Sequence, residues 1–292
     1  MKTFPYSSNR IPKENLTIVV WSDRKDQLKT HFKIAVSTVE NVVKRLGLPA
    51  DCFIPYDISH AHYTWLGLEQ FKSGADVFNA NALLNDGETK ETTADGLLQY
   101  LEILKSEGNP LLQIRCGGFR KARCLCHGAA LQSWDCITGG AEFHSYERTP
   151  YQALIYGSPG GPVISTGWAV DEQLHLDPQR LVDLRRKALQ FNFRDKFEAK
   201  LHPERRDADF YTRIGTFGKS APANIEMVLA EAREELNAGA VSDPFPILLS
   251  DLYVVYYRDT NLSSIIDQVS VDEAIKQPSR LRNIWDNWYK AQ

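Results

Sequence analysis

Residues 59–69 read SHAHYTWLGLE, and the interpretation of the whole chain depends on this stretch. Aromatic and aliphatic residues follow two histidines without a helical period, which predicts a strand that begins after a polar turn. Alternate side chains of a strand share a face, so His62 and Thr64 point the same way. Tyr63 and Trp65 then point to the opposite face. An imidazole that can transfer protons thus stands beside a hydroxyl that can bond a phosphate oxygen.

A His-x-Thr strand also has an explanation without function, because short patterns of this kind arise by chance. A strand whose polar face is simply hydrated would carry the same residues. A second stretch strengthens the functional interpretation, since HYTWLG at 62–67 is echoed by FYTRIG at 210–215. The two frames agree at tyrosine, threonine and glycine, and they differ where the first has histidine.

The composition limits the class of protein. The chain has 292 residues, of which 43% are hydrophobic and 24% charged, and this fits one large domain or two closely packed halves. A net charge of -3 argues against bulk binding of duplex DNA and leaves room for a local basic cleft. Residues 1–13 lack an apolar signal core, and no run approaches the roughly 20 apolar residues of a membrane-spanning helix. We therefore expect a soluble, cytoplasmic protein without membrane contact.

The rest of the chain predicts alternating strands and helices, in the order strand, helix, strand in each half. Strands are expected at 15–22, 52–56, 111–119, 123–132, 151–156, 163–170, 209–217 and 247–257, and helices at 23–46, 94–106, 177–197 and 224–238. Residues 71–93 are polar and small, which predicts a long loop that is functional or mobile. Residues 258–292 are a C-terminal extension that we expect to dock as a helix, because free tails rarely carry aromatics such as Trp285, Trp288 and Tyr289.

On these motifs and on the order of elements, the sequence resembles the 2H phosphoesterase superfamily, which contains LigT-like RNA ligases and cyclic phosphodiesterases. The resemblance covers roughly residues 15–257. It implies an α+β fold of two pseudo-symmetric lobes around a central cleft, each lobe an antiparallel sheet with helices on its outer face. The lobes would cover about 15–110 and 111–257, interleaved within a domain of residues 1–257. In that family two histidines act as base and acid, hydroxyls hold the phosphate oxygens, and no metal or cofactor is needed.

Carried over by position, His62 and Thr64 match the first family motif, and Thr212 matches the hydroxyl of the second. Phe210 stands where the family has its second histidine. One positioned acid or base typically contributes about 10²- to 10⁴-fold in rate, so its loss leaves a slow enzyme or none. Phe210 either stacks on a nucleobase or packs in the core, and both alternatives stay open.

Other side chains are candidates for binding the substrate. Tyr211 is expected on the face away from the cleft unless a bulge shifts the register by one residue. Strand parity places Arg213 on the outer face as well. His202, in the preceding loop, can fold back over the cleft, and Arg115 can bond phosphate oxygens in a bidentate manner.

A group of cysteines raises the alternative of a zinc site. Cys116, Cys124, Cys126, His127 and Cys136 fall within 21 residues. Structural zinc sites usually pair ligands as C-x₂₋₄-C, and the spacing between the second and third of these cysteines is tighter than that. Free cysteine is commonly buried, so core cysteines are the favoured interpretation. An odd total of five cysteines without a secretory signal also favours reduced thiols.

We therefore expect a phosphodiesterase that acts on a cyclic or 2′-5′-linked phosphodiester of a nucleotide or RNA end. His62 would act as general acid or base, and Thr64 and Thr212 would hold the phosphate, with no metal and no cofactor. The first alternative is a catalytically silent nucleotide- or RNA-binding protein on the same fold, motivated by Phe210. A zinc-stabilised interaction protein is the second alternative.

Overall fold

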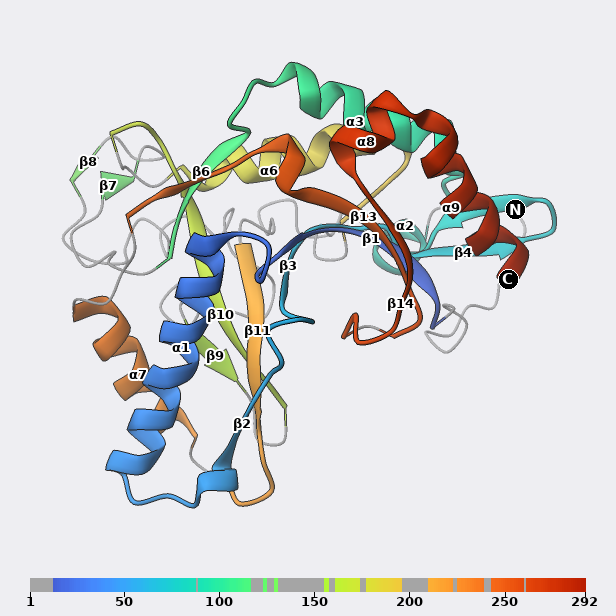
Figure 1. Ribbon diagram of the computed structural model, residues 1–292. Helices are drawn as coiled ribbons and strands as arrows, with labels where there is room; N and C mark the ends of the chain where they lie inside the picture. The colour runs from blue at the N-terminus through green and yellow to red at the C-terminus, as the bar shows by residue number, and fades with distance from the viewer. Residues whose placement is uncertain are drawn as a thin grey trace.

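One main antiparallel sheet with helices packed against it forms the fold (Figure 1). The structure is a computed structural model that describes residues 13–87, 89–116, 123–124, 129–130, 155–157, 161–173, 177–195, 210–222, 225–238, 243–259 and 261–292. The strands are β1 (Asn15–Trp21), β2 (Phe53–Pro55), β3 (His62–Gly67), β4 (Gln70–Ser73), β5 (Asp76–Asn79), β6 (Leu112–Arg115), β7 (Arg123–Cys124), β8 (Ala129–Ala130), β9 (Ile155–Gly157), β10 (Pro162–Val170), β11 (Phe210–Phe217), β12 (Phe245–Ile247), β13 (Leu252–Tyr257) and β14 (Ile265–Ser270). The α-helices are α1 (Asp26–Arg45), α2 (Ala80–Asp86), α3 (Ala94–Ser106), α6 (Pro178–Arg186), α7 (Glu226–Ala238), α8 (Val271–Lys276) and α9 (Pro278–Ala291), and the 3₁₀-helices are η2 (Ala50–Cys52), η6 (Lys187–Phe191) and η7 (Leu249–Asp251).

The strands of the main sheet follow the order β12-β6-β10-β11-β3-β1-β13-β14, while β2 pairs with β11 and β9 pairs with β10. Each of the strand pairs in the described part of the chain is antiparallel, which together with the helices confirms an antiparallel α+β fold. Strands from both predicted halves of the chain intermingle in this order, because β3 lies between β1 and β11 and β13 lies beside β1. The sheet is therefore continuous from one half to the other.

The helices of the two large cores lie on one side of this sheet. Ser165 of β10, Thr212 of β11 and Tyr63 of β3 are paired in register, so their side chains share a face. Ser165 lies against α1, because its hydroxyl oxygen is 2.8 Å from Nε2 of His31. Tyr63 packs in the same core as Leu101 of α3. The group formed by α3, α6, α8 and α9 and the pair formed by α1 and α7 therefore cover the same face (Figure 1).

The longest helix, α1, shows how the sequence pattern produces this packing. Its buried residues recur every three or four positions and form one apolar stripe: Leu28, His31, Phe32, Ala35, Thr38, Val39, Val42 and Val43. The helix predicted at 23–46 is therefore confirmed to within three residues at its start and one at its end. β9 and β10, which overlap the strands predicted at 151–156 and 163–170, pair with each other in antiparallel orientation.

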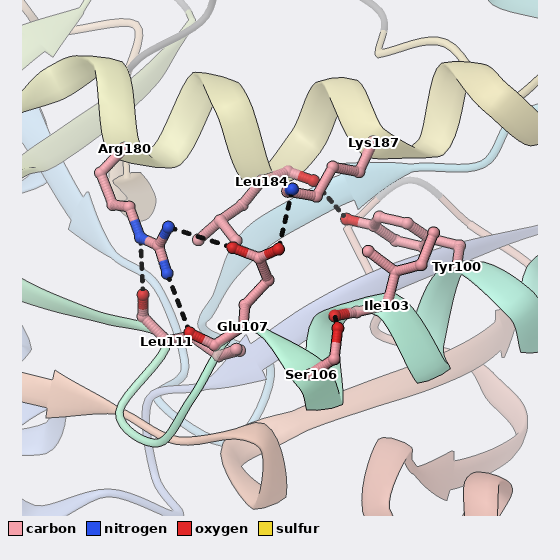
Figure 2. A network of polar contacts seen from close by, with 8 residues as sticks. All are labelled: Tyr100, Ile103, Ser106, Glu107, Leu111, Arg180, Leu184 and Lys187. Atoms are coloured by element: carbon pink, nitrogen blue, oxygen red, sulfur yellow. Dashed lines mark hydrogen bonds and ion pairs between the residues drawn. The ribbon is translucent and has the colours of Figure 1, made fainter.

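A polar network joins the end of α3 to α6 on the helical side (Figure 2). Glu107 Oε2 accepts from Arg180 Nη1 at 3.2 Å, and Glu107 Oε1 accepts from Lys187 Nζ at 2.8 Å. Arg180 also donates from Nε to the carbonyl of Leu111, the residue before β6. The hydrogen bond from Lys187 and the charge of Arg180 lower the pKa of Glu107. Solvent reaches all three charged groups, so the network orients α6 and contributes on the order of 1 kcal/mol or less per pair.

Residues 71–86, the larger part of the stretch predicted as a long loop at 71–93, form two strands and a helix, so that prediction is wrong for them. β4 and β5 form a hairpin in which Ser73 pairs with Asp76 around a turn at Gly74. α2 follows directly, and the side chain of Asn79 caps it by accepting from the backbone N–H of Ala82 at 2.7 Å. The turn and the helix cap require small polar residues, so the composition of this segment resembles that of a loop.

Replacing Gly74 by alanine is expected to lower the free energy of unfolding by about 1 kcal/mol, because a left-handed φ strains residues with a Cβ. Gly74 has a φ of +66°, and no atom lies within 4 Å of the added Cβ, so backbone strain acts alone. Gly74→Asn should lose less, since asparagine tolerates left-handed φ. Urea denaturation measures the difference, and equal midpoints for the wild type and Gly74→Ala would contradict an ordered hairpin.

The C-terminal third departs from the prediction at two places, the strand expected at 247–257 and the extension 258–292, which is predicted to dock as a helix and also contains the strand β14. The strand expected at 247–257 is interrupted, because the turn η7 separates β12 from β13. Beyond β13 the chain adds the edge strand β14 and the helices α8 and α9. α9 buries Leu281, Ile284, Trp285 and Trp288 against the core shared with α3, so the chain end belongs to the folded unit.

Candidate functional site

The strands that carry the two echoed motifs, β3 and β11, are neighbours in the sheet. They run antiparallel, with Tyr63 paired to Thr212. The strands meet as the repeated motif predicts, but the register differs by one residue from the one that would align both hydroxyls. Because side chains alternate along a strand, that one residue decides the face on which each motif residue lies.

Four polar side chains of these strands lie together on the face opposite the helices. Counting outward from the paired residues places His62 opposite Arg213 and Thr64 opposite Tyr211. All four are partly exposed, while the residues between them are buried. The expectation that Tyr211 and Arg213 point away from His62 is therefore wrong. We call His62, Thr64, Tyr211 and Arg213 the polar quartet.

Phe210 and Thr212 lie on the helix-covered side, away from the polar quartet. The fully buried ring of Phe210 stacks on Tyr63, with centroids 4.5 Å apart and 14° between the planes. Thr212 is also fully buried, and its hydroxyl has no hydrogen-bond partner within the described part of the chain. The expectation that Thr64 and Thr212 face each other across one phosphate is wrong in geometry. Of the two alternatives for Phe210, core packing is the one observed.

The imidazole of His62 is held in one tautomer. Its Nδ1 lies 2.9 Å from the carbonyl oxygen of His60. A carbonyl can only accept, so Nδ1 carries the proton and Nε2 keeps a lone pair. No described group bonds Nε2, and the ring meets Trp21 edge-on with centroids 5.8 Å apart. Burial lowers the pKa of His62 to about 4, the bond to His60 opposes this shift, and the charge of Arg213 lowers the pKa further. At neutral pH His62 is therefore an uncharged base.

The guanidinium of Arg213 is fixed beside His62 by the turn that follows β13. It donates to the side-chain oxygen of Asn261, and its Cζ lies 5.9 Å from the ring centroid of Tyr56. Tyr56 in turn donates to the carbonyl of Asn261. Since a guanidinium has five N–H donors, this arrangement orients Arg213 and leaves donors for an anion.

β3 is braced from the helical side by a buried arginine. Arg185 donates from Nε to the carbonyl of Trp65 at 2.7 Å and from Nη2 to the carbonyl of Thr64 at 2.9 Å. The strand needs these donors because a register shift between Ile18 and Val19 leaves Trp65 without a partner in β1. The bulge and Arg185 together hold the backbone of β3 at Thr64 and Trp65, where the part of this strand that belongs to the polar quartet ends.

Arg115 and His202, predicted to bind substrate, are not part of the polar quartet. Arg115 pairs with Trp168 of β10, so it shares the face opposite the helices, yet β10 and β11 stand between it and β3. Three strand spacings correspond to about 14 Å, too far for one small ligand group. Burial lowers the pKa of Arg115, and the charge of Asp243 opposes this. His202 lies outside the described residues.

The part of the chain that the structure describes contains no candidate zinc site. Among the residues that it describes, no group of three or more His, Cys, Asp or Glu side chains could hold a metal ion. Cys52 and Cys116 are free and buried, and burial raises the pKa of both thiols. The side chains of Cys124, Cys126, His127 and Cys136 lie outside the described part, so the zinc hypothesis stays a prediction.

Comparison with known proteins identifies no relative. No family model matches the chain, and neither a curated protein nor a solved structure matches it. Within the described ranges, no helix has both the length and the apolar character needed to cross a membrane. The function must therefore be argued from the polar quartet itself.

A signal for the correct face of β11 was present in the sequence. Phe210, Thr212 and Ile214 occupy alternate positions, and two of the three are large and apolar. Apolar residues at alternate positions mark the core face of a strand. This pattern assigns Tyr211 and Arg213 to the opposite face. The motif alignment with His62-x-Thr64 masked this simpler pattern.

Proposed function

We propose that the protein is a phosphodiesterase that uses the polar quartet to cleave a cyclic or 2′-5′-linked phosphodiester of a nucleotide or RNA end. The observation that supports it is one uncharged base, one guanidinium and two hydroxyls, all partly exposed, on the face of adjacent strands opposite the helices. The proposal includes the two-lobed arrangement of the 2H phosphoesterases, with the quartet in the groove between the lobes, and a cytoplasmic location.

In this mechanism Nε2 of His62 removes a proton from the attacking water, and the water oxygen forms the new bond to phosphorus. Arg213 and the hydroxyl of Thr64 bind the two non-bridging oxygens, where charge builds up in the transition state. The bond from phosphorus to the leaving sugar oxygen breaks, and the phenol of Tyr211 gives that oxygen its proton. Diagonal neighbours on adjacent strands are about 7–8 Å apart, which lets His62 and Tyr211 flank one phosphate.

A silent nucleotide- or RNA-binding protein on the same fold is the second candidate. Two observations favour it. The position of the second family histidine holds the core residue Phe210, and a base with a pKa of about 4 is weaker than the ideal near the working pH. This candidate requires the same quartet to bind the ligand, so it differs from the first only in turnover.

The test compares two isosteric threonine variants on opposite faces of the sheet. Thr64→Val should lower kcat/KM for 2′,3′-cyclic AMP and for a 2′-5′-linked adenylate by about tenfold, because a hydrogen bond to a charged phosphate is lost. Thr212→Val should leave kcat/KM unchanged, because its hydroxyl is buried and bonds nothing among the described residues.

Comparing the two variants distinguishes the polar quartet, which includes Thr64, from the site that the sequence motifs predicted, which also includes Thr212. A large loss in Thr212→Val together with a neutral Thr64→Val would overturn the quartet and restore the motif alignment. Binding of both ligands without turnover by the wild type would select the silent binder. Absence of binding and of turnover would reject both candidates.

A further inference from the structure

A second polar site lies next to the polar quartet, at the end of β1. An open pocket of about 110 Å³ is lined there by Val20, Trp21, Arg24, Lys25, Ser250, Asp251 and Tyr253. Trp21 connects the two sites, because it pairs with His62 in the sheet and contacts its ring. The mechanism proposed for the quartet uses none of the pocket residues.

Arg24 is held in this pocket by aromatic rings instead of by an acid. Its Cζ lies 4.4 Å from the ring centroid of Tyr253 and 5.5 Å from that of Trp21. Stacking of this kind fixes the plane of a guanidinium and leaves its N–H edges free. Among the described residues Arg24 has no hydrogen bond and no ion pair, although the exposed carboxylates of Asp23 and Asp26 are close in sequence.

The other charges of the pocket cancel each other. Lys25 Nζ lies 2.7 Å from Oδ2 of Asp251, and the same oxygen accepts from the backbone N–H of Leu248 at 2.9 Å. The pocket therefore presents one uncompensated positive charge, that of Arg24, together with the hydroxyl of Ser250. Such a combination binds an oxyanion through charge-assisted hydrogen bonds.

The size of the pocket decides what kind of anion fits. A site for a whole nucleotide or a drug-sized ligand usually spans about 300–1,000 Å³. At about 110 Å³ this pocket holds roughly the volume of three or four water molecules, which suits a single phosphate group. The ring centroid of His62 lies 5.8 Å from that of Trp21, and Cζ of Arg24 lies 5.5 Å from the Trp21 centroid, so at most about 11 Å separates Arg24 Cζ from the imidazole centroid.

We propose that this pocket binds a second phosphate of a single-stranded oligonucleotide whose reacting phosphodiester lies at the polar quartet. The inference rests on the proposed function and narrows it to substrates longer than a mononucleotide. Arg24 bonds the non-bridging oxygens of the flanking phosphate. Contacts of this kind position a strand without reading its bases, so preference for length is expected without preference for sequence.

The test uses two substrates with the same reacting bond, 2′,3′-cyclic AMP and an adenosine trinucleotide that ends in a 2′,3′-cyclic phosphate. In Arg24→Gln the ratio of kcat/KM for the trinucleotide to that for cyclic AMP should fall about tenfold. Arg24→Lys should recover only part of the loss, because a point charge lacks the fork of donors. Lys44→Gln is the matched control, since it removes one exposed charge about 30 Å away at the other end of α1 and should leave the ratio unchanged.

Binding of the trinucleotide in a His62→Ala background gives a second measurement without turnover. Loss of one phosphate contact should make the slope of log Kd against log salt concentration shallower by about 0.7 in the Arg24→Gln variant. A wild type that prefers the trinucleotide while Arg24→Gln keeps the full ratio and slope would overturn the second phosphate site and leave the proposed function intact. A wild type that binds neither substrate would overturn both.

Discussion

Replacing His62 by alanine is expected to lower kcat/KM for 2′,3′-cyclic AMP by about 10²- to 10⁴-fold, because the variant lacks the group that deprotonates the attacking water. His62 is the group of the polar quartet that has a free ring lone pair at neutral pH. Since burial lowers its pKa to about 4, the wild-type rate should stay level between about pH 5 and neutral pH and fall below about pH 4. A pH profile of kcat/KM measures this directly.

His60→Ala is the matched control for this experiment. It removes the neighbouring imidazole, which contacts Tyr56 with ring centroids 6.4 Å apart, and it keeps the backbone carbonyl that holds Nδ1 of His62. This variant should keep activity near that of the wild type. Equal rates for wild type and His62→Ala, with both folded, would remove His62 from the mechanism. Ligand binding without turnover in either protein would select the silent binder.

The sequence allowed the correct prediction of β3, because strong alternation made each residue's face unambiguous. Tyr63 and Trp65 are large and apolar, and they are fully buried beneath the helices, which leaves His62 and Thr64 on the open side. The helix α1 was equally predictable from its apolar period. In both cases hydrophobic burial decides the structure, and the spacing of apolar residues within one short segment predicts which side chains are buried.

β11 was misjudged because its face depends on pairing with a strand almost 150 residues away. The repeated Tyr-Thr frame aligned Phe210 with His62, but antiparallel pairing of Tyr63 with Thr212 reverses the order of residues across the two strands. Arg24 was missed for a related reason. Its sequence neighbours place it at the start of the helix predicted at 23–46, and its aromatic contacts include Tyr253, a residue of β13. When a site is formed by strands far apart in the sequence, the order and register of the strands must be known before a motif residue can be assigned to one face of the sheet.

The buried histidine of α1 leads to the largest expected effect on stability. His31 is 5% exposed, its Nε2 lies 2.8 Å from the hydroxyl oxygen of Ser165, and burial lowers its pKa to about 4 from 6.5. Between these two pH values the unfolded chain binds a proton that the native protein does not. Acidification therefore favours unfolding, by about 1.4 kcal/mol per pH unit for one such group. The total from pH 6.5 to pH 4 is about 3 kcal/mol for His31.

The free energy of unfolding of the wild type, measured by urea denaturation at pH 4, 5 and 6.5, should therefore decrease as the pH falls. His31→Gln keeps a hydrogen-bonding side chain for Ser165 but cannot titrate, so its stability should fall by about 3 kcal/mol less over the same range. His60→Gln, which removes a histidine from a surface turn, should follow the wild-type curve. Parallel curves for wild type and His31→Gln would show that His31 is protonated to the same extent in both states, and this would contradict its place between α1 and the sheet. Ser165, the partner of His31, shares a face of the sheet with its paired neighbour Thr212. That result would therefore also contradict the assignment of Thr212 to the helix-covered core, on which the definition of the polar quartet depends.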